Sequence, residues 1–218
     1  MMATLPALIL SVLAVAEAYV NVSELIDNQF LNPYQDPSRF IANKSDIYLL
    51  RASVLAGTAS TISQTPLPCV RSRYWSNRTR RAERSFDVYS KTNESDYESI
   101  NISLTVQKEP WKTILHVDPN GKNMSVIDVP YMNTSTFSAH LNRTFLVLYS
   151  DVNCLILADQ MRRGNRSLSR LYCSMWLTEN RIRRPPKCCQ FIFELLCAYY
   201  VDSVTFFEES CLNNRTTA

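Results

Sequence analysis

The chain has very little of what most enzymes need. Only 3 of its 218 residues are glycine and 2 are histidine. It contains no Gly-x-Gly-x-x-Gly, no Gly-x-Ser-x-Gly and no phosphate-binding loop, so the common motifs for dinucleotide, hydrolase and nucleotide chemistry are missing. His116 and His140 have no metal-ligand spacing to each other or to a cysteine pair. We therefore expect no enzyme activity, no cofactor and no metal site.

Strong charge and long apolar runs are also lacking. The formal net charge is +3, which is a poor match for nucleic acid as the main partner. The most apolar stretch in the second half, Phe191 to Val201, is interrupted by Glu194 and is too short to span a membrane. We therefore expect neither a nucleic-acid partner nor a membrane anchor.

The amino terminus has the pattern of a signal peptide. Residues Leu5 to Val15 form a short apolar stretch, and Ala16-Glu17-Ala18 has the small-x-small pattern of a cleavage site. We predict that residues 1–18 are removed and that residues 19–218 form a single domain, secreted to the extracellular space.

Glycan acceptor sequences are abundant. N-x-Ser/Thr sequons are glycosylated only in the secretory pathway, and a glycan must point towards water. Ten of the asparagines lie in such sequons, and we predict a glycoprotein with these positions facing solvent: Asn21, Asn43, Asn77, Asn93, Asn101, Asn123, Asn133, Asn142, Asn165 and Asn214.

Seven cysteines indicate disulfide bonds in an exported protein. They are Cys69, Cys154, Cys173, Cys188, Cys189, Cys197 and Cys211. Because the number is odd, at least one thiol is left over or pairs between molecules. Cys188 and Cys189 are adjacent and cannot both serve the same partner.

Most of the chain reads as short β-strands separated by polar turns. The clearest is Ser99 to Gln107, in which Ile100, Ile102, Leu104 and Val106 alternate with Asn101, Ser103 and Thr105. That alternation puts one face on a core and Asn101 on the wet face. Other strands are expected at Asp46–Leu55, Cys69–Trp75, Ser85–Lys91, Trp111–Val117, Ser125–Tyr131, Thr144–Tyr149, Asn153–Ala158, Leu171–Thr178 and Val204–Phe207.

Helices are expected only near the two ends of the mature chain. Asp36 to Asn43 begins with a capping residue and a proline, which suit a first helical turn. Lys187 to Tyr200 follows two prolines and is apolar on most faces. About eight strands without helical crossovers predict an all-β protein, either an antiparallel sandwich or a closed barrel.

The residues around the cysteines resemble a known family. One strand carries Tyr149-Ser150-Asp151-Val152-Asn153-Cys154 and the next carries Cys173-Ser174-Met175-Trp176, followed by a helix with Cys189 and Cys197. With Pro186, Phe193, Cys69 and Cys211, this pattern is similar to the tick salivary lipocalins, the histamine-binding protein family. The resemblance implies an eight-stranded antiparallel lipocalin barrel with a short amino-terminal helix and a carboxy-terminal helix packed on it.

The resemblance also implies three disulfides and a function. The implied pairs are Cys69–Cys211, Cys173–Cys197 and Cys154 with Cys189, or with Cys188 in its place. Family members are secreted with tick saliva and sequester small host mediators such as histamine, serotonin or leukotrienes to suppress host defence. We expect a monomeric scavenger of this kind. The alternative is an effector whose loops bind a host protein of complement or haemostasis.

The expected ligand-binding residues are aromatic: Trp176, with Tyr48, Trp75 and Tyr89 as further candidates. In the amine-binding members an Asp directly follows the cysteine of one strand, and a Glu lies two residues before the Trp of the next. Here those positions hold Leu155 and Ser174. A buried ammonium needs a counter-charge, so these changes count against an amine ligand unless Asp87 or Asp151 points inward.

A lipid mediator with a carboxylate would instead need a cation. Arg51, Arg71 and Arg73 lie on expected strands and are candidates for that role. Arginines also crowd one loop as Arg78, Arg80, Arg81 and Arg84. Such a cluster either binds polyanions or is solvated loop charge, and a glycan at Asn77 would obstruct it.

Overall fold

The computed structural model describes residues 33–54, 67–78, 81–91, 97–120, 143–159, 171–198 and 202–213. The predicted signal peptide and the expected strand Ser125–Tyr131 lie outside these ranges. Among the described residues, no helix has the length and apolar character needed to cross a bilayer.

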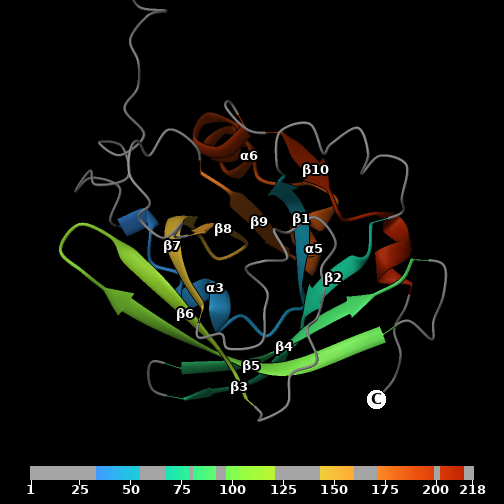
Figure 1. The fold of residues 1–218 in the computed structure, drawn as a ribbon, viewed down its shortest axis with the longest axis horizontal. Helices are drawn as coiled ribbons and strands as arrows, with labels where there is room; N and C mark the ends of the chain where they lie inside the picture. Colours follow the sequence, from blue (N-terminus) through green and yellow to red (C-terminus); the bar gives the residue numbers. More distant parts are fainter. Residues whose placement is uncertain are drawn as a thin grey trace, which may run out of the picture.

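Eight antiparallel strands form a closed barrel (Figure 1). Neighbouring strands pair in sequence order, and the last pairs with the first, which closes the ring. The strands are β1 (Ile47–Ser53), β2 (Cys69–Ser72), β4 (Arg81–Tyr89), β5 (Tyr97–Lys108), β6 (Thr113–Pro119), β7 (Arg143–Ser150), β8 (Cys154–Asp159) and β9 (Cys173–Thr178). This architecture confirms the predicted lipocalin-like barrel.

Two further strands lie beside the ring. β3 (Tyr74–Arg78) pairs with β4, and β10 (Ser203–Thr205) pairs with β1. The prediction of one strand over Cys69–Trp75 is therefore wrong, because the chain divides at Arg73. β2 pairs with both β1 and β4, whereas β3 pairs with β4 and continues away from the ring as a hairpin.

The helices lie where the sequence indicates. α3 (Ser38–Ile41) falls inside the expected Asp36–Asn43, and the Asp36 carboxylate accepts a hydrogen bond from the Ser38 backbone N–H at 3.0 Å. α6 (Lys187–Phe193) begins at the expected residue and continues as a π-helical segment, η3 (Glu194–Ala198). Two short helices were not foreseen: α5 (Glu179–Ile182) and η4 (Glu209–Leu212).

The two ends of the barrel differ. At one end lie α3, α5, the hairpin between β3 and β4, and the short β5–β6 and β7–β8 connections; we call it the α3 end. The other end, which we call the loop end, is where β1, β4, β6 and β8 end and where β2, β5, β7 and β9 begin.

Each barrel strand presents one row of side chains to the interior and one to the outside. Residues that pair across neighbouring strands share a face. Phe86 of β4 contacts Trp176 of β9 with ring centroids 6.2 Å apart, although β2 and β1 separate these strands in the sheet. This contact therefore spans the interior, and the apolar residues clustered with the two rings form the inner core.

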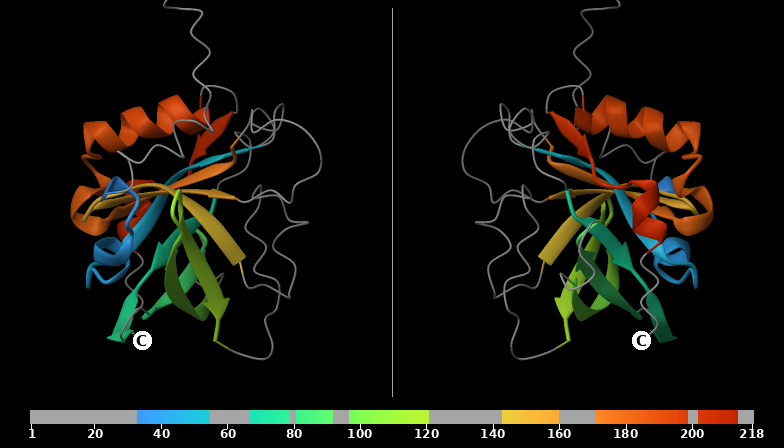
Figure 2. Two further views of the ribbon diagram at one scale, coloured as in Figure 1. Left: turned by 90° about the vertical axis from the view of Figure 1, so that its left-hand side faces the viewer. Right: turned by 90° about the vertical axis from the view of Figure 1, so that its right-hand side faces the viewer.

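A second core lies outside the barrel wall, beneath the carboxy-terminal segment. Phe193 and Leu196 of the α6–η3 helix and Phe207 pack on outward residues of β8, β9 and β1 such as Ile156, Met175 and Tyr48. Figure 2 shows α6 lying across one side of the strands. These barrel strands are thus buried on both faces.

Three disulfides cross this outer core. They join Cys69 to Cys211, Cys154 to Cys189 and Cys173 to Cys197, the pairs that the resemblance implies. The seventh cysteine, Cys188, is exposed and unpaired among the described residues, with its sulfur 3.5 Å from the hydroxyl of Tyr149.

The alternation predicted over Ser99–Gln107 holds with one exception. Asn101 is exposed, as its sequon requires, but Ser103 on the same face is fully buried. The Ser103 hydroxyl lies 2.8 Å from a Glu83 carboxylate oxygen and 2.8 Å from the Asn120 side-chain oxygen, while Arg81 also contacts it. This polar cluster covers Ser103, so the prediction that this whole face of the strand is exposed to water is wrong at Ser103.

Three of the ten sequon asparagines lie in the described ranges. Asn77 and Asn101 are exposed and Asn43 is half-buried. The Asn43 amide donates to the Val152 carbonyl at 3.1 Å and its oxygen accepts from the Ser45 N–H at 2.9 Å. Glycosylation removes only one of the two amide hydrogens, so this hydrogen bond is compatible with a glycan. The other seven sequons lie outside the described residues.

Candidate ligand-binding site in the barrel

Trp176 lies on the inward row of β9. Its Cα partners are Leu155 on β8 and Leu49 on β1, and its indole N–H donates to the Ser174 hydroxyl at 2.9 Å. The indole is only half-buried although its neighbours are apolar. Of the four aromatic candidates, Trp176 is the one that the structure places in the barrel interior.

The surroundings of Trp176 are apolar. Phe86 faces it from the opposite wall, and half-buried Ile100 lies next to Phe86 on β5. The remaining inward residues clustered around the rings include Leu49, Val70, Val88, Ile102, Leu155 and Leu157. These side chains suit an apolar ligand surface.

The two positions of the missing acids do face this interior. Leu155 is buried beside Trp176, and Ser174 is the Cα partner of the inward Leu157. An acid at either position would lie next to the indole. In this chain one position is apolar and the other carries a neutral hydroxyl that accepts the indole hydrogen bond.

Neither of the proposed replacement acids points inward. Asp87 is fully buried on the outer row of β4, where its carboxylate lies 3.2 Å from Arg71 Nε and 2.8 Å from Arg73 Nε. Asp151 lies in the β7–β8 hairpin and accepts the backbone N–H groups of Asn153 and Cys154. Both carboxylates are therefore part of the fold rather than of the interior.

The three arginine candidates also face outwards. Arg71 and Arg73 hold Asp87, as described. Arg51 pairs with Glu194 and lies over the ring of Phe193 with its guanidinium carbon 5.0 Å from the centroid. These contacts place all three side chains among the carboxy-terminal elements or on the outer wall.

Tyr48 and Tyr89 belong to the outer core. The Tyr48 ring packs edge-on against Phe207 at 5.7 Å, and the Tyr89 hydroxyl donates to the Cys211 carbonyl at 2.7 Å. Burial raises the pKa of both phenols above the usual value. The structure therefore places both rings outside the barrel interior, because the carboxy-terminal segment covers the outer face of their strands.

Trp75 lies outside as well. It sits on β3, which has left the ring, and is 58% exposed. The presence of an aromatic residue on an expected strand does not show whether its side chain faces inwards or outwards. Around Trp75 the alternation of apolar and polar residues is too short to distinguish the two faces.

Arg84 was expected in a surface loop, and this expectation is wrong. It is 1% exposed, on the same inward row as Ala82 and Phe86, at the α3 end. Its guanidinium donates to the Ser72 hydroxyl at 3.0 Å and to four carbonyl oxygens, those of Ile41, Asn43, Ser45 and Ser72. Burial lowers its pKa to about 10.

Arg84 fastens the elements that cover the α3 end of the barrel. Its hydrogen bonds tie α3 and the segment before β1 to the end of β2. The signal for this role was present in the sequence, since Ala82, Arg84, Phe86 and Val88 are spaced by two. An arginine at an interior position of that pattern indicates a buried cation with several acceptors.

Carboxylates do occur on inward rows at the loop end. Asp159 is the Cα partner of Phe145 and Glu98 that of Val88. Asp159 lies two inward positions beyond Leu155 along β8. These acids therefore lie near the loop end of the barrel rather than beside Trp176. Among the described residues, no group of histidine, cysteine or acidic side chains could hold a metal ion.

A family model described as "Tick histamine binding protein" matches residues 25–213. Among solved structures, the chain is similar to Japanin from Rhipicephalus appendiculatus bound to cholesterol, with 21% identity and a TM-score of 0.50. That match covers 79% of this chain and 98% of Japanin. The siderocalin Ex-FABP, described as having dual ligand specificities, matches with 11% identity, a TM-score of 0.44 and coverage of 74% and 91%. No curated protein sequence matches the chain.

Proposed function

The chain belongs to the tick histamine-binding protein family, and from this premise we propose that it captures a small apolar ligand in the barrel interior around Trp176. Capture of this kind is stoichiometric and requires no turnover. The interior carries the argument, because its apolar walls and its indole offer a binding surface rather than a catalytic one.

A lipid suits this apolar interior better than a biogenic amine does. Burying an ammonium without a carboxylate costs several kcal/mol or more. The two anchor positions hold Leu155 and Ser174, and Asp87 and Asp151 are engaged elsewhere. A neutral ligand meets no such penalty against Leu49, Phe86 and Trp176.

Within the lipids, we favour a sterol-like molecule over a leukotriene. A leukotriene carboxylate needs a partner cation, and Arg51, Arg71 and Arg73 are held on the outer wall. A sterol needs only apolar contact and one hydrogen bond at the rim. Japanin, which has the same fold, is seen with cholesterol bound, and this supports the choice.

We further propose that the protein is secreted with tick saliva as a glycosylated monomer and suppresses host defence by removing a host mediator. The ten sequons, the apolar amino terminus and three disulfides support export. The mediator would be a lipid, while histamine and serotonin are the family's amine alternatives.

Calorimetric titration with cholesterol, a leukotriene, histamine and serotonin tests the proposal. We expect cholesterol to bind at one molecule per chain and both amines to bind at least tenfold more weakly. Trp176→Ala should weaken the cholesterol complex about tenfold or more, because an aromatic wall is lost, while Trp75→Ala should leave it unchanged. Tighter binding of an amine would restore the amine function. Absence of all four complexes would favour the alternative effector of host complement or haemostasis.

A further inference from the structure

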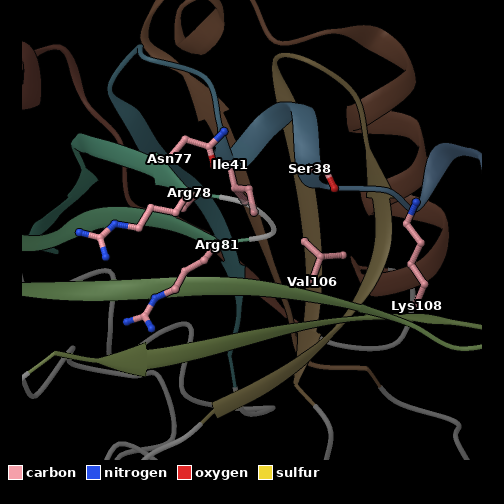
Figure 3. Close-up of a pocket in the computed structure, with 8 residues that line it drawn as sticks. Ser38, Ile41, Asn77, Arg78, Arg81, Val106 and Lys108 are labelled. Atoms are coloured by element: carbon pink, nitrogen blue, oxygen red, sulfur yellow. The ribbon is translucent and has the colours of Figure 1, made fainter.

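A cavity of about 750 Å³ lies at the α3 end of the barrel. Figure 3 shows that its lining residues come from α3, the β3–β4 hairpin and β5. A volume of this size is within the range of small-ligand pockets. Trp176 and Phe86 are not among the lining residues, so the cavity is separate from the aromatic pair inside the barrel.

Asn77 faces this cavity from β3. It is the Cα partner of Ala82, and Ala82 is the partner of the inward Leu104. Residues that pair across neighbouring strands share a face, so Asn77 lies on the inward row. Because β3 lies beside the ring, this part of the row meets the cavity and α3. The side chain of Asn77 is exposed, which leaves room for a substituent on its amide.

The two arginines that border the cavity face the other way. Arg78 and Arg81 are Cα partners of each other on the outer row, where Arg81 pairs with Glu83. In Figure 3 their guanidinium groups extend away from Ile41 and Val106. An occupant of the cavity is therefore held by the inward residues and by α3.

The cavity wall is apolar with a polar edge. Ile41 and Ala82 are 5% and 1% exposed, and half-buried Val106 packs with the same inner core. Ser38 and Lys108 also line the cavity and are exposed. This combination suits a sugar ring, which has C–H groups on its faces and hydroxyl or acetamido groups around its edge.

The sequence supplies such a sugar at the cavity itself. Asn77 begins the sequon Asn77-Arg78-Thr79, a glycan acceptor in the secretory pathway. Glycosylation joins C1 of N-acetylglucosamine to the amide nitrogen, which loses one hydrogen as a proton, while the lipid diphosphate of the donor leaves with the bonding electron pair. A tethered sugar has a high effective concentration and has already lost the freedom that a free sugar would lose on binding. Weak contacts therefore suffice to hold it.

We propose that the first sugar of the Asn77 glycan occupies this cavity and covers the α3 end of the barrel. One face of its ring would lie against Ile41 and Val106. Its acetamido carbonyl would accept a hydrogen bond from Lys108, whose ammonium has three N–H donors and gives one to Asp36. The later sugars would extend into solvent. This inference rests on the proposed glycosylation but not on capture of a ligand in the barrel.

The other two described sequon asparagines do not line this cavity. Asn101 is exposed on the outer face of β5. The amide of Asn43 donates to the Val152 carbonyl. A glycan on Asn101 would therefore extend into solvent from its first sugar onwards, which makes Asn101 the matched control for Asn77.

Digestion of the folded glycoprotein with peptide N-glycosidase F, followed by glycopeptide mass spectrometry, tests the site. The enzyme cleaves the bond between asparagine and the first sugar, so a sugar held in the cavity is protected. We expect release from Asn77 to be about tenfold slower than from Asn101, as for a sugar held about nine-tenths of the time. After denaturation the two rates should be equal. Ser38→Trp, which fills the cavity from an exposed helix position, should abolish the protection.

Thermal unfolding gives an independent measure. Thr79→Ala removes the sequon and keeps Asn77, so it deletes the sugar alone. We expect this variant to lower the unfolding midpoint by about 2–4 °C, and Asn101→Gln to lower it by less than about 1 °C. Equal shifts would contradict the proposal.

The outcomes separate this inference from the proposed function. Trp176→Ala should leave the protection of the Asn77 glycan unchanged, so failure of capture in the barrel does not remove it. Equally fast release from Asn77 and Asn101 in the folded protein overturns the inference. An Asn77 without sugar beside a glycosylated Asn101 overturns it as well, while the proposed glycosylation stands. Absence of sugar from every sequon overturns both.

Discussion

The two sides of the barrel are built differently. On the side of α6, strands β8 and β9 lie between two cores, and most of their residues are buried on both faces. On the side of the β3–β4 hairpin, the outer face meets water and carries Arg78, Arg81, Glu83 and the sequon asparagine Asn101. One wall is stabilised by packing and disulfides, whereas the other depends on its inner face and on surface polar contacts.

This difference assigns separate tasks to the two sides. All three disulfides belong to the doubly buried side and its carboxy-terminal cover, so the chain end is held there. The hairpin side keeps its outer surface free for sugar and charge, and together with α3 and β5 it lines a cavity at the α3 end. The inner core around Trp176 lies between them and contains residues from both walls, such as Phe86 and Trp176.

The largest effect should come from removing the longest covalent link. Cys69→Ser combined with Cys211→Ser opens a bridge with a sequence separation of 142. On the chain-entropy model this lowers the free energy of unfolding by about 5 kcal/mol, measured by denaturant titration. The matched control is Cys188→Ser, which removes an exposed unpaired thiol and should change stability by less than about 0.5 kcal/mol. Equal effects of the two changes would contradict the described pairing.

Two phenylalanines on α6 sharpen the comparison at a single helix. Phe193 is fully buried in the outer core, whereas Phe191 is 65% exposed. Phe193→Ala should cost about 3–5 kcal/mol of unfolding free energy through the cavity it leaves. Phe191→Ala should cost less than about 1 kcal/mol. If thermal unfolding showed similar losses for both, α6 would not pack as described.

Arg84 and Arg81 make the corresponding test on the hairpin side. Arg84→Met removes a buried cation and leaves the carbonyls of Ile41, Asn43 and Ser45 without their donor. We expect a loss of about 3 kcal/mol. Arg81→Met acts at a half-exposed ion pair and should cost no more than about 1 kcal/mol. If the Arg84→Met variant were as stable as the native protein, the α3 end of the barrel would not depend on this side chain.

The smallest effect concerns pH at the α3 end. Burial would raise the Asp36 pKa, but hydrogen bonds from Lys108 and Ser38 bring it below the usual value. Its contribution to stability is therefore complete above roughly pH 4 and is lost as the pH falls through the lowered pKa. The difference in unfolding free energy between the native protein and Asp36→Asn should shrink on acidification. A difference that grows below pH 4 would reverse the sign of the argument.

Strands and the exposure of their residues could be predicted best where one face of the strand is exposed to solvent. Over Ser99–Gln107 apolar and polar residues alternate, so the strand and the exposure of Asn101 could be predicted directly. On β8, Cys154–Ala158 is buried throughout, and such a run predicts a strand without showing which residues face the barrel interior. Leu155 could be assigned inward only once the pairing with Trp176 was known.

The candidate site was harder to predict for the same reason. Tyr48 and Tyr89 lie on barrel strands, but the segment that buries their outer face comes from more than 100 residues further along the chain. Asp87 and the arginines around it are held together on that outer face by three strands and a connection. The spacing of residues within one strand does not show that a distant segment covers its outer face. The buried position of Arg84, in contrast, could have been predicted, because Arg84 alternates with Ala82 and Phe86 on one face of the strand.

The most direct test of capture in the barrel uses Trp176 as its own reporter. Trp75 and Trp111 are 58% and 54% exposed, so Trp75→Phe with Trp111→Phe should leave the fold intact and Trp176 as the remaining tryptophan. Titration of this variant with cholesterol should change its fluorescence in a saturable way that ends at one ligand per chain. Binding detected by calorimetry without any change in that fluorescence would place the ligand elsewhere and contradict the account.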